Sequence, residues 1–363
     1  MSLSIGIVGL PNVGKSTLFN ALTDSSALAA NYPFATIEPN TGIVPVPDER
    51  LTILQQLYNA AKVIPATVTF VDIAGLVAGA SAGEGLGNKF LANIRQCDAI
   101  VHVVRAFEND DIVHVANRIH PRDDIQIINT ELILADLQTI DNRLPKLAKE
   151  AKADPSKRPA LELLQDVRAH LDAGEIISAE SRVKSQELRE WLQKELQLLT
   201  LKPVIYAFNV DEETLANDTK KAELRDLAGT SRSIFICAKL EEELRGLDPA
   251  ESAELLESYG VSESGLVQLI HAAYDTLGLQ SYLTAGPKEV RAWTIKKGAT
   301  APEAAGVIHT DFQRGFIAAS IVSYPDLVAA GSEAVAKQQG KVATVGKDYV
   351  MQPDDIVEFR FNV

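Results

Sequence analysis

A short glycine-bearing run near the N-terminus constrains the fold of this chain more than any other feature. Residues 9–16 read Gly-Leu-Pro-Asn-Val-Gly-Lys-Ser and match the pattern G-x-x-x-x-G-K-[ST]. An apolar strand, Ser4 to Leu10, leads into the run, and the helical pattern STLFNALT follows it. Backbone N–H groups in such a loop, together with the start of the helix, attract phosphate. The run therefore predicts a phosphate-binding loop, and an accidental glycine turn is the alternative.

Several later segments have the composition of buried strands. They are rich in β-branched and apolar residues, and helix-length stretches separate them. The segments are Thr67 to Ile73, Ala99 to Arg105, Val204 to Asn209 and Ser233 to Cys237. Strands that alternate with helices predict an α/β fold with a mainly parallel sheet and helices on both faces.

Strand signals are absent between residues 129 and 200, where apolar residues follow a heptad spacing. Ile133, Leu137, Ile140, Leu144 and Leu147 are three or four residues apart. This spacing predicts an inserted antiparallel helical hairpin, or coiled-coil arm. A proline within its first helix, at position 145, should kink that helix.

The pattern changes again from residue 278 onward. VRAWTI, FIAASIVS and IVEFRF have the composition of strands, and Thr300 with Glu303 forms a capping box that opens a helix. These features predict a small α+β module. We therefore expect a nucleotide-binding domain from residues 1–128 plus 201–277, a helical arm from 129–200 and a C-terminal domain from 278–363.

Charge and composition exclude several classes of protein. The net charge of −14 argues against a chain that coats nucleic acid over its whole surface, and we expect no DNA partner. No apolar run approaches the roughly 20 residues of a spanning helix, so we expect a cytoplasmic protein without a membrane partner. The two cysteines, Cys97 and Cys237, are too few for a disulfide framework.

The phosphate loop predicts the residues around a nucleotide and its Mg²⁺. Lys15 should meet the β- and γ-phosphates, while Ser16 and Asp72 supply metal ligands. Asp72 opens the segment Asp-Ile-Ala-Gly, whose Gly75 can bring its N–H to the γ-phosphate. Thr36 lies where a switch loop would add a third Mg²⁺ ligand, although it could be an ordinary loop threonine. The expected nucleotide contacts in the loop are Asn12, Val13, Gly14, Lys15, Ser16 and Thr17.

The segments GLPNVGKSTLFNALT, DIAGLVAGASAGEGLGNKFL, HTDF and FNV resemble the Obg-like ATPase subfamily (YchF type) of translation-factor-related P-loop proteins. The resemblance covers essentially the whole chain and implies a C-terminal TGS-like β-grasp domain. It also implies a nucleotide-switch ATPase that associates with ribosomes and ribosomal RNA, and that regulates translation or a linked stress response.

Base recognition is predicted to depend on the loop Asn209-Val210-Asp211-Glu212. The guanine-reading motif N-K-x-D ends in an Asp that accepts two hydrogen bonds, whereas this loop has valine in place of lysine and ends in Glu212. Backbone groups near Val210 could instead satisfy adenine, and the Asn-x-x-Glu pattern matches the ATP preference of the family. Glu212 could also be a solvated loop carboxylate. Cys237 and Ala238 resemble the base-supporting S-A-K motif, with cysteine replacing serine.

Hydrolysis requires a group that positions water, and the usual glutamine after D-x-x-G is Leu76 here. Asn12 is the residue that helps to hold K⁺ in related proteins, so we expect K⁺ beside Mg²⁺. His114 is a candidate ligand of the attacking water, with a surface or capping histidine as the alternative. The predicted catalytic residues are thus Lys15, Asp72, Gly75 and His114.

We interpret the chain as a slow Mg²⁺-dependent ATPase that controls docking on a ribosome. One alternative is a GTPase of the Obg class that uses Asn209 and Asp211 in a distorted pocket. Another is an RNA- or ribosome-binding scaffold in which the nucleotide is structural. A metabolic P-loop kinase fits less well, because the sequence contains no evident acceptor-binding motif.

Overall fold

The computed structural model describes residues 3–24, 41–73, 86–107, 120–176, 188 and 191–362. Within these ranges the chain forms two compact units. The first runs to residue 24 and includes 41–42 and 69–269, whereas the second comprises 43–68 and 270–362. Residues 43–68 were expected in the nucleotide-binding domain. They belong to the second unit because β3 (Val63–Ile64) pairs in parallel with β9 (Val290–Lys296).

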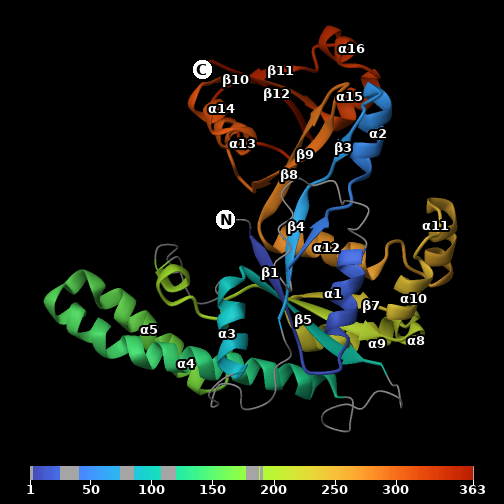
Figure 1. The fold of residues 1–363 in the computed structure, drawn as a ribbon. Coiled ribbons are helices and arrows are strands. Elements are labelled where there is room, and N and C mark those ends of the chain that lie inside the picture. The colour runs from blue at the N-terminus through green and yellow to red at the C-terminus, as the bar shows by residue number, and fades with distance from the viewer. Residues whose placement is uncertain are drawn as a thin grey trace. The chain divides into compact units, whose positions relative to one another are not determined.

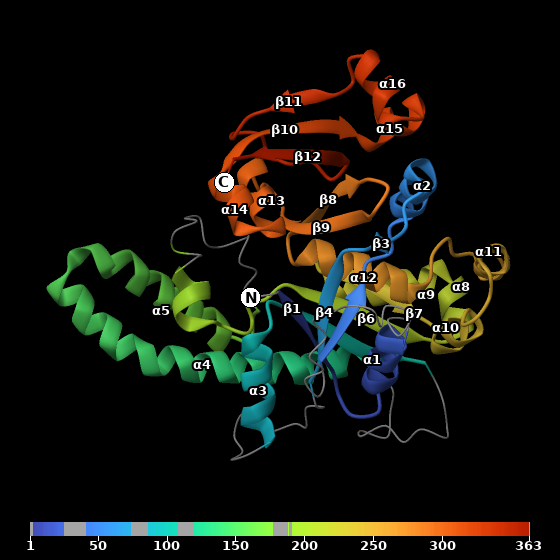
Figure 2. The ribbon, with the colours of Figure 1, turned by 45° about the horizontal axis from the view of Figure 1, so that its top comes forward.

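A six-stranded sheet in the order β2-β4-β1-β5-β6-β7 forms the frame of the first unit. Its strands are β1 (Ser4–Val8), β2 (Thr41–Pro45), β4 (Thr67–Asp72), β5 (Ala99–Ala106), β6 (Val204–Val210) and β7 (Arg232–Ile236). The four pairings among β4, β1, β5, β6 and β7 are all parallel, which confirms the predicted α/β class. Figures 1 and 2 show the sheet with helices packed around it.

The helices of this unit follow the strands in the expected alternation. They are α1 (Lys15–Asp24), α3 (Leu86–Gln96), α8 (Glu212–Ala216), α9 (Asp218–Ala228), α10 (Ala238–Glu243), α11 (Pro249–Ser258) and α12 (Gly265–Thr276). Stacked rings of Phe208 and Phe235, 5.7 Å between centroids, contribute to a core beneath α8 and α10. Register aligns Asn209 with Arg105 and Ile236, so the carboxyl ends of β5, β6 and β7 meet at one edge. Ligands of open parallel sheets bind at such an edge.

The predicted helical arm consists of α4 (Pro121–Ala153), a 3-10 turn (Pro155–Lys157), α5 (Arg158–Asp172) and a π-helical turn (Leu192–Leu196). Figures 1 and 2 show α4 and α5 running side by side. Their shared core includes the predicted seam residues Ile133, Ile140 and Leu147. Helix α4 continues through Pro145, where the sequence predicts a kink. Its first turns belong to the nucleotide-binding core, because Ile125 packs with Phe208.

The second unit contains a sheet in the order β11-β10-β12-β8-β9-β3. Strands β8 (Leu279–Ala285), β10 (Phe316–Ser323), β11 (Ala343–Val345) and β12 (Asp355–Phe361) join β9 and β3. Strand β12 pairs in parallel with β8 and antiparallel with β10. The helices are α2 (Glu49–Tyr58), α13 (Ala301–Ile308), α14 (Thr310–Arg314), α15 (Tyr324–Ala330) and α16 (Glu333–Gln338).

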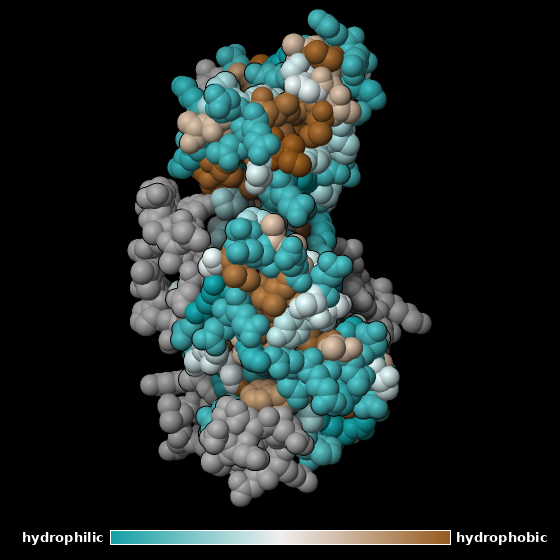
Figure 3. All heavy atoms as spheres, turned by 90° about the vertical axis from the view of Figure 1, so that its right-hand side faces the viewer, coloured by the Kyte–Doolittle hydropathy of each residue, from teal (hydrophilic) through white to brown (hydrophobic). Residues whose placement is uncertain are grey.

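Sequence predicted three strands of this sheet and missed the others. β8 reads LQSYLTA and buries the polar residues Gln280 and Ser281, whose hydrogen bonds to Met351 O and Tyr274 OH satisfy them. The capping box at Thr300 is present, with the Thr300 N–H donating to Glu303 Oε2 at 2.7 Å. Figure 3 shows hydrophobic surface on this unit between hydrophilic borders, and exposed Val328 and Val335 lie on α15 and α16.

Candidate functional site

The phosphate loop has the backbone that its glycines predict. Gly14 adopts φ +100°, and a Cβ at this position would lie 2.5 Å from Asn209 Nδ2. Asn12 has φ +62°, a left-handed conformation that asparagine tolerates better than most residues. Asn209 Nδ2 donates a hydrogen bond to Val13 O at 3.1 Å. The end of β6 therefore anchors the loop.

Lys15 is buried at the first position of α1. Its side chain is 8% exposed, and Nζ donates to Leu10 O at 2.6 Å. Burial lowers the pKa of Lys15 to about 8, an effect that the charge of Asp72 opposes. Burial likewise raises the pKa of Asp72, and Lys15 opposes that shift. The loop thus holds a cation close to a carboxylate where solvent is largely excluded.

Ser16 and Asp72, the predicted Mg²⁺ ligands, carry the hard oxygen atoms that suit this ion. Ser16 is exposed on α1, and Asp72 ends β4, opposite Ile7 of β1. The described residues contain no group of three or more His, Cys, Asp or Glu side chains that could hold a metal ion. In nucleotide sites Mg²⁺ is bound through one or two carboxylates, and phosphates and water complete its coordination. Thr36, the predicted third ligand, lies outside the described residues.

The two loops predicted to surround the base have distinct internal contacts. The Val210 side chain is buried in the core with Phe208, and Asp211 accepts a hydrogen bond from Thr214 N at 2.8 Å as the cap of α8. Glu212 Oε1 lies 2.5 Å from Lys239 Nζ. Burial raises the pKa of the Cys237 thiol, which precedes α10.

Most predicted nucleotide contacts line one cavity of about 590 Å³. Those that line it are Asn12, Gly14, Lys15, Ser16, Thr17, Asn209, Val210, Glu212, Cys237 and Ala238. Val13 is buried, so its side chain packs inward and only its backbone serves the loop. Gly75 and His114 lie outside the described residues, as Thr36 does. The roles of all these residues toward a nucleotide stay predictions.

The sequence analysis missed Phe107, which also lines this cavity. The guanidinium of buried Arg105 lies 4.6 Å from the centre of the Phe107 ring, and Arg105 Nε donates to Phe107 O at 3.2 Å. These contacts fix the ring at the end of β5. An aromatic residue directly after a buried strand was the available signal.

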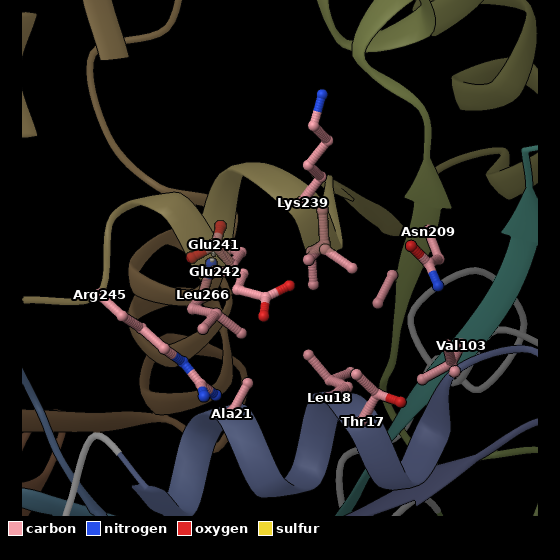
Figure 4. A pocket seen from close by; sticks show the side chains of 14 residues that line it. Thr17, Leu18, Ala21, Val103, Asn209, Lys239, Glu241, Glu242, Arg245 and Leu266 are labelled. Carbon is pink, nitrogen blue, oxygen red and sulfur yellow. Dashed lines mark hydrogen bonds between the residues drawn. The ribbon is translucent and has the colours of Figure 1, made fainter. Parts of the chain in front are cut away.

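A second cavity of about 350 Å³ adjoins the first and shares five lining residues with it, Gly14, Thr17, Asn209, Ala238 and Lys239. Figure 4 shows Leu18 and Ala21 of α1 facing residues of α10 across this cavity. The Lys239 side chain points away from it. Glu241 is buried, and its carboxylate accepts a hydrogen bond from Leu266 N at 3.2 Å, so it caps α12.

In the part of the chain that the structure describes, no helix is long and apolar enough to cross a membrane. Two family models match the chain. One, described as "50S ribosome-binding GTPase", matches residues 4–134. The other, YchF-GTPase_C, described as "Protein of unknown function (DUF933)", matches residues 279–362.

Relatives match over the full length. The "Ribosome-binding ATPase YchF" of Bacillus subtilis (strain 168) is 51% identical over 369 residues, covering 100% of both chains. Its namesake from Escherichia coli O157:H7 is 47% identical over 367 residues, also with 100% of both covered. The solved "Structure of the Schizosaccharomyces pombe YchF GTPase" superposes with a TM-score of 0.86 at 38% identity, covering 99% of this chain and 98% of that one. The resemblance drawn from the sequence motifs is confirmed, and the chain belongs to the YchF family.

Proposed function

We propose that this chain is a Mg²⁺-dependent ATPase that hydrolyses ATP to ADP and phosphate and associates with the ribosome to regulate translation or a linked stress response. The names of its full-length relatives, "Ribosome-binding ATPase YchF", support ATP hydrolysis and ribosome binding. In this proposal the first unit binds the nucleotide, residues 129–200 within it form the arm, and residues 278–363 of the second unit form a TGS-like β-grasp domain. The protein works in the cytoplasm, with the ribosome and its RNA rather than DNA as partner.

The contacts of loop 209–212 support the proposed preference for ATP over GTP. A guanine-specific site needs a carboxylate that accepts two hydrogen bonds from the base. Asp211 instead caps α8 through Thr214 N, and Glu212 pairs with Lys239. Because the Val210 side chain is buried, the backbone C=O and N–H near it are the groups left to meet adenine. These contacts also disfavour the alternative of a GTPase that reads guanine with Asp211.

Calorimetric titration of the purified protein with ATP and with GTP in Mg²⁺ tests this choice. We expect ATP to bind at least tenfold more tightly, a difference of about 1.4 kcal/mol. The related Schizosaccharomyces pombe protein is named a GTPase, so GTP is the decisive competitor. A tenfold preference for GTP would refute the adenine assignment.

The metal proposal assigns Mg²⁺ to Ser16, Asp72 and Thr36. These residues would hold the ion, which would supply charge neutralisation to the phosphates, while Lys15 would hold the β- and γ-phosphates and Gly75 would offer an N–H to the γ-phosphate. Asn12 supports K⁺ as a second ion, and His114 remains our candidate for holding the attacking water. We expect K⁺ to stimulate turnover more than Na⁺ at matched ionic strength. Equal rates in the two salts, or K⁺ stimulation that survives Asn12→Ala, would remove K⁺ from the proposal.

Ribosome contact is assigned to a cationic patch on the second unit, defined by Lys288, Arg291, Lys296 and Lys297, of which Arg291 pairs with Glu289 and Lys297 with Asp275. The three lysines are exposed, and the Arg291 guanidinium lies 3.8 Å from the centre of the Trp293 ring, a cation beside a stacking surface. Val290 N donates to Lys62 O, so the sequence-distant Lys62 borders the same strand. Lysines that protect a strand edge from aggregation are the simpler alternative.

Charge reversal separates these two interpretations. The triple change Lys288→Glu, Lys296→Glu and Lys297→Glu should weaken cosedimentation with ribosomes and reduce its salt dependence, while ATP hydrolysis by the isolated protein persists. The same change at Lys337, Lys341 and Lys347 alters net charge equally and is the control. Unchanged cosedimentation would move the docking surface to Lys146–Arg158 of the arm. Ribosome affinity independent of nucleotide would favour the scaffold function.

A further inference from the structure

Three elements of the first unit meet at one carboxylate oxygen. Glu212 Oε1, at the start of α8, accepts hydrogen bonds from Lys239 Nζ at 2.5 Å and from Tyr259 OH at 3.0 Å. Lys239 belongs to α10, and Tyr259 directly follows α11. We call these three residues the Glu212 latch. Figure 4 shows the Lys239 side chain turned away from the adjoining cavity.

Packing of the Tyr259 ring holds the latch in one position. The ring packs against the hydrophobic cluster that contains Val210, Leu215 and Leu240, so the core positions its hydroxyl. An exposed Lys–Glu pair alone contributes less than about 1 kcal/mol and does not hold one geometry. Here the Glu212 and Lys239 side chains are 41% and 63% exposed, and the packed tyrosine supplies the rigidity that the pair lacks. These donors hold the pKa of Glu212 below its usual value, so the carboxylate is ionised.

The latch occupies acceptor positions on Glu212 that guanine would need. A carboxylate has about four acceptor positions, two on each oxygen. Guanine offers two donors, N1–H and N2–H, which need one acceptor on each oxygen of the same carboxylate. Both positions on Glu212 Oε1 already receive donors, from Lys239 and Tyr259. Guanine would therefore have to break one of these two hydrogen bonds, whereas adenine presents no such donor pair.

We propose that Tyr259 is a positioning residue for nucleotide specificity, which keeps Glu212 from accepting guanine and thereby favours ATP. This inference rests on the proposed ATP preference and adds a residue that lies outside both base-binding loops. Tyr259 acts on the base site through Glu212, its shorter contact at 3.0 Å, while its hydroxyl also lies 3.4 Å from Glu243 Oε2. Its hydroxyl contributes nothing to the affinity for ATP itself.

Dissociation constants for ATP and GTP, measured by calorimetry on the full-length Tyr259→Phe protein, test the proposal. We expect GTP to bind the Tyr259→Phe protein about threefold to tenfold more tightly than it binds the wild type, which corresponds to the free energy of one hydrogen bond. The affinity for ATP should change by no more than about twofold. Tyr349→Phe is the matched control, because it removes a tyrosine–carboxylate hydrogen bond, to Asp355, in the second unit. It should change neither affinity.

A double-mutant cycle shows whether Tyr259 acts through Glu212. In a Glu212→Ala background, Tyr259→Phe should leave the ratio of the two affinities unchanged. Equal weakening of both nucleotides, or an unchanged ratio in Tyr259→Phe alone, would overturn the proposal while the ATP preference of the wild type stands. A wild-type preference for GTP would overturn the proposed function and the latch together. Lys239→Met, which removes the other donor, should shift the ratio in the same direction if Tyr259→Phe fails to fold.

Discussion

Two buried charges in the first unit differ in how completely the protein satisfies them. Asp136, in the middle of α4, is fully buried and accepts three hydrogen bonds, from Leu199 N, Thr200 N and Thr200 Oγ1, each within 2.8 Å. Among the described residues, Lys15 Nζ donates one hydrogen bond, to Leu10 O. Lysine carries three donors.

The difference matches the roles we propose for the two residues, a structural charge at Asp136 and a phosphate-binding charge at Lys15. Burial raises the pKa of Asp136, and the three donors oppose that shift in part. Burial lowers the pKa of Lys15, and the opposing charge is the single carboxylate of Asp72. Asp136 joins α4 to the segment that returns from the arm. In the proposed function the remaining donors of Lys15 bind phosphate oxygens, and burial of the charged amine costs free energy of folding.

The largest expected effect is on Asp136. Asp136→Ala leaves two backbone N–H groups and a hydroxyl without their acceptor, and should lower the free energy of unfolding by about 3 to 5 kcal/mol. Urea unfolding measures the change. Asp141→Ala on the same helix removes an exposed pair with Arg168 and should change it by less than about 1 kcal/mol. Equal losses in the two variants would show that Asp136 does not hold the root of the arm.

The next effect is on activity. Lys15→Ala should lower ATP turnover at least about a hundredfold, because it removes the cation that meets the developing phosphate charge. Its free energy of unfolding should stay the same or rise, since the variant no longer buries an amine. Lys220→Ala, which breaks a surface pair with Glu213, is the control for turnover. Undiminished hydrolysis in a folded Lys15→Ala protein would contradict the phosphate-loop assignment.

The smallest effect concerns pH. Lys15 has a pKa of about 8 in the folded protein and an ordinary value of 10.5 when unfolded. Between these values the unfolded chain binds more protons, so this group makes the free energy of unfolding rise with pH. The rise is about 1 kcal/mol between pH 8 and pH 9. Urea unfolding of wild type and Lys15→Ala at both pH values isolates it. An identical pH dependence in the two proteins would mean that Lys15 is not desolvated.

The sequence predicted those parts of the fold and site that depend on local pattern. The phosphate loop is contiguous, the parallel strands are rich in β-branched residues, and the arm seam follows heptad spacing. The sequence pattern did not reveal β3, which is only two residues long, or β8, whose buried polar residues interrupt the apolar pattern. A charge such as Asp136 in a helix resembles a solvated residue until its partners at Leu199 and Thr200 are known.

Sequence patterns did not predict contacts between segments that are far apart in the chain. Glu212 meets Lys239 and Tyr259 across 27 and 47 residues, and no periodicity signals either contact. Phe107 differs, because it contacts Arg105 only two residues away and its place directly after a buried strand was a signal in the sequence. The motif residues could therefore be named in advance, while the residues that position them could not.

Helix α4 also has a mechanical consequence. It is one continuous helix of 33 residues, whose first turns pack in the nucleotide-binding core through Ile125 and whose later turns form the arm through Leu147. Such a helix is about 50 Å long. If it moves as a rigid rod, each degree of rotation at its first turn displaces its last turn by about 0.9 Å over that length. The arm is thus a lever that converts small angular changes in the core into ångström-scale displacements at its tip.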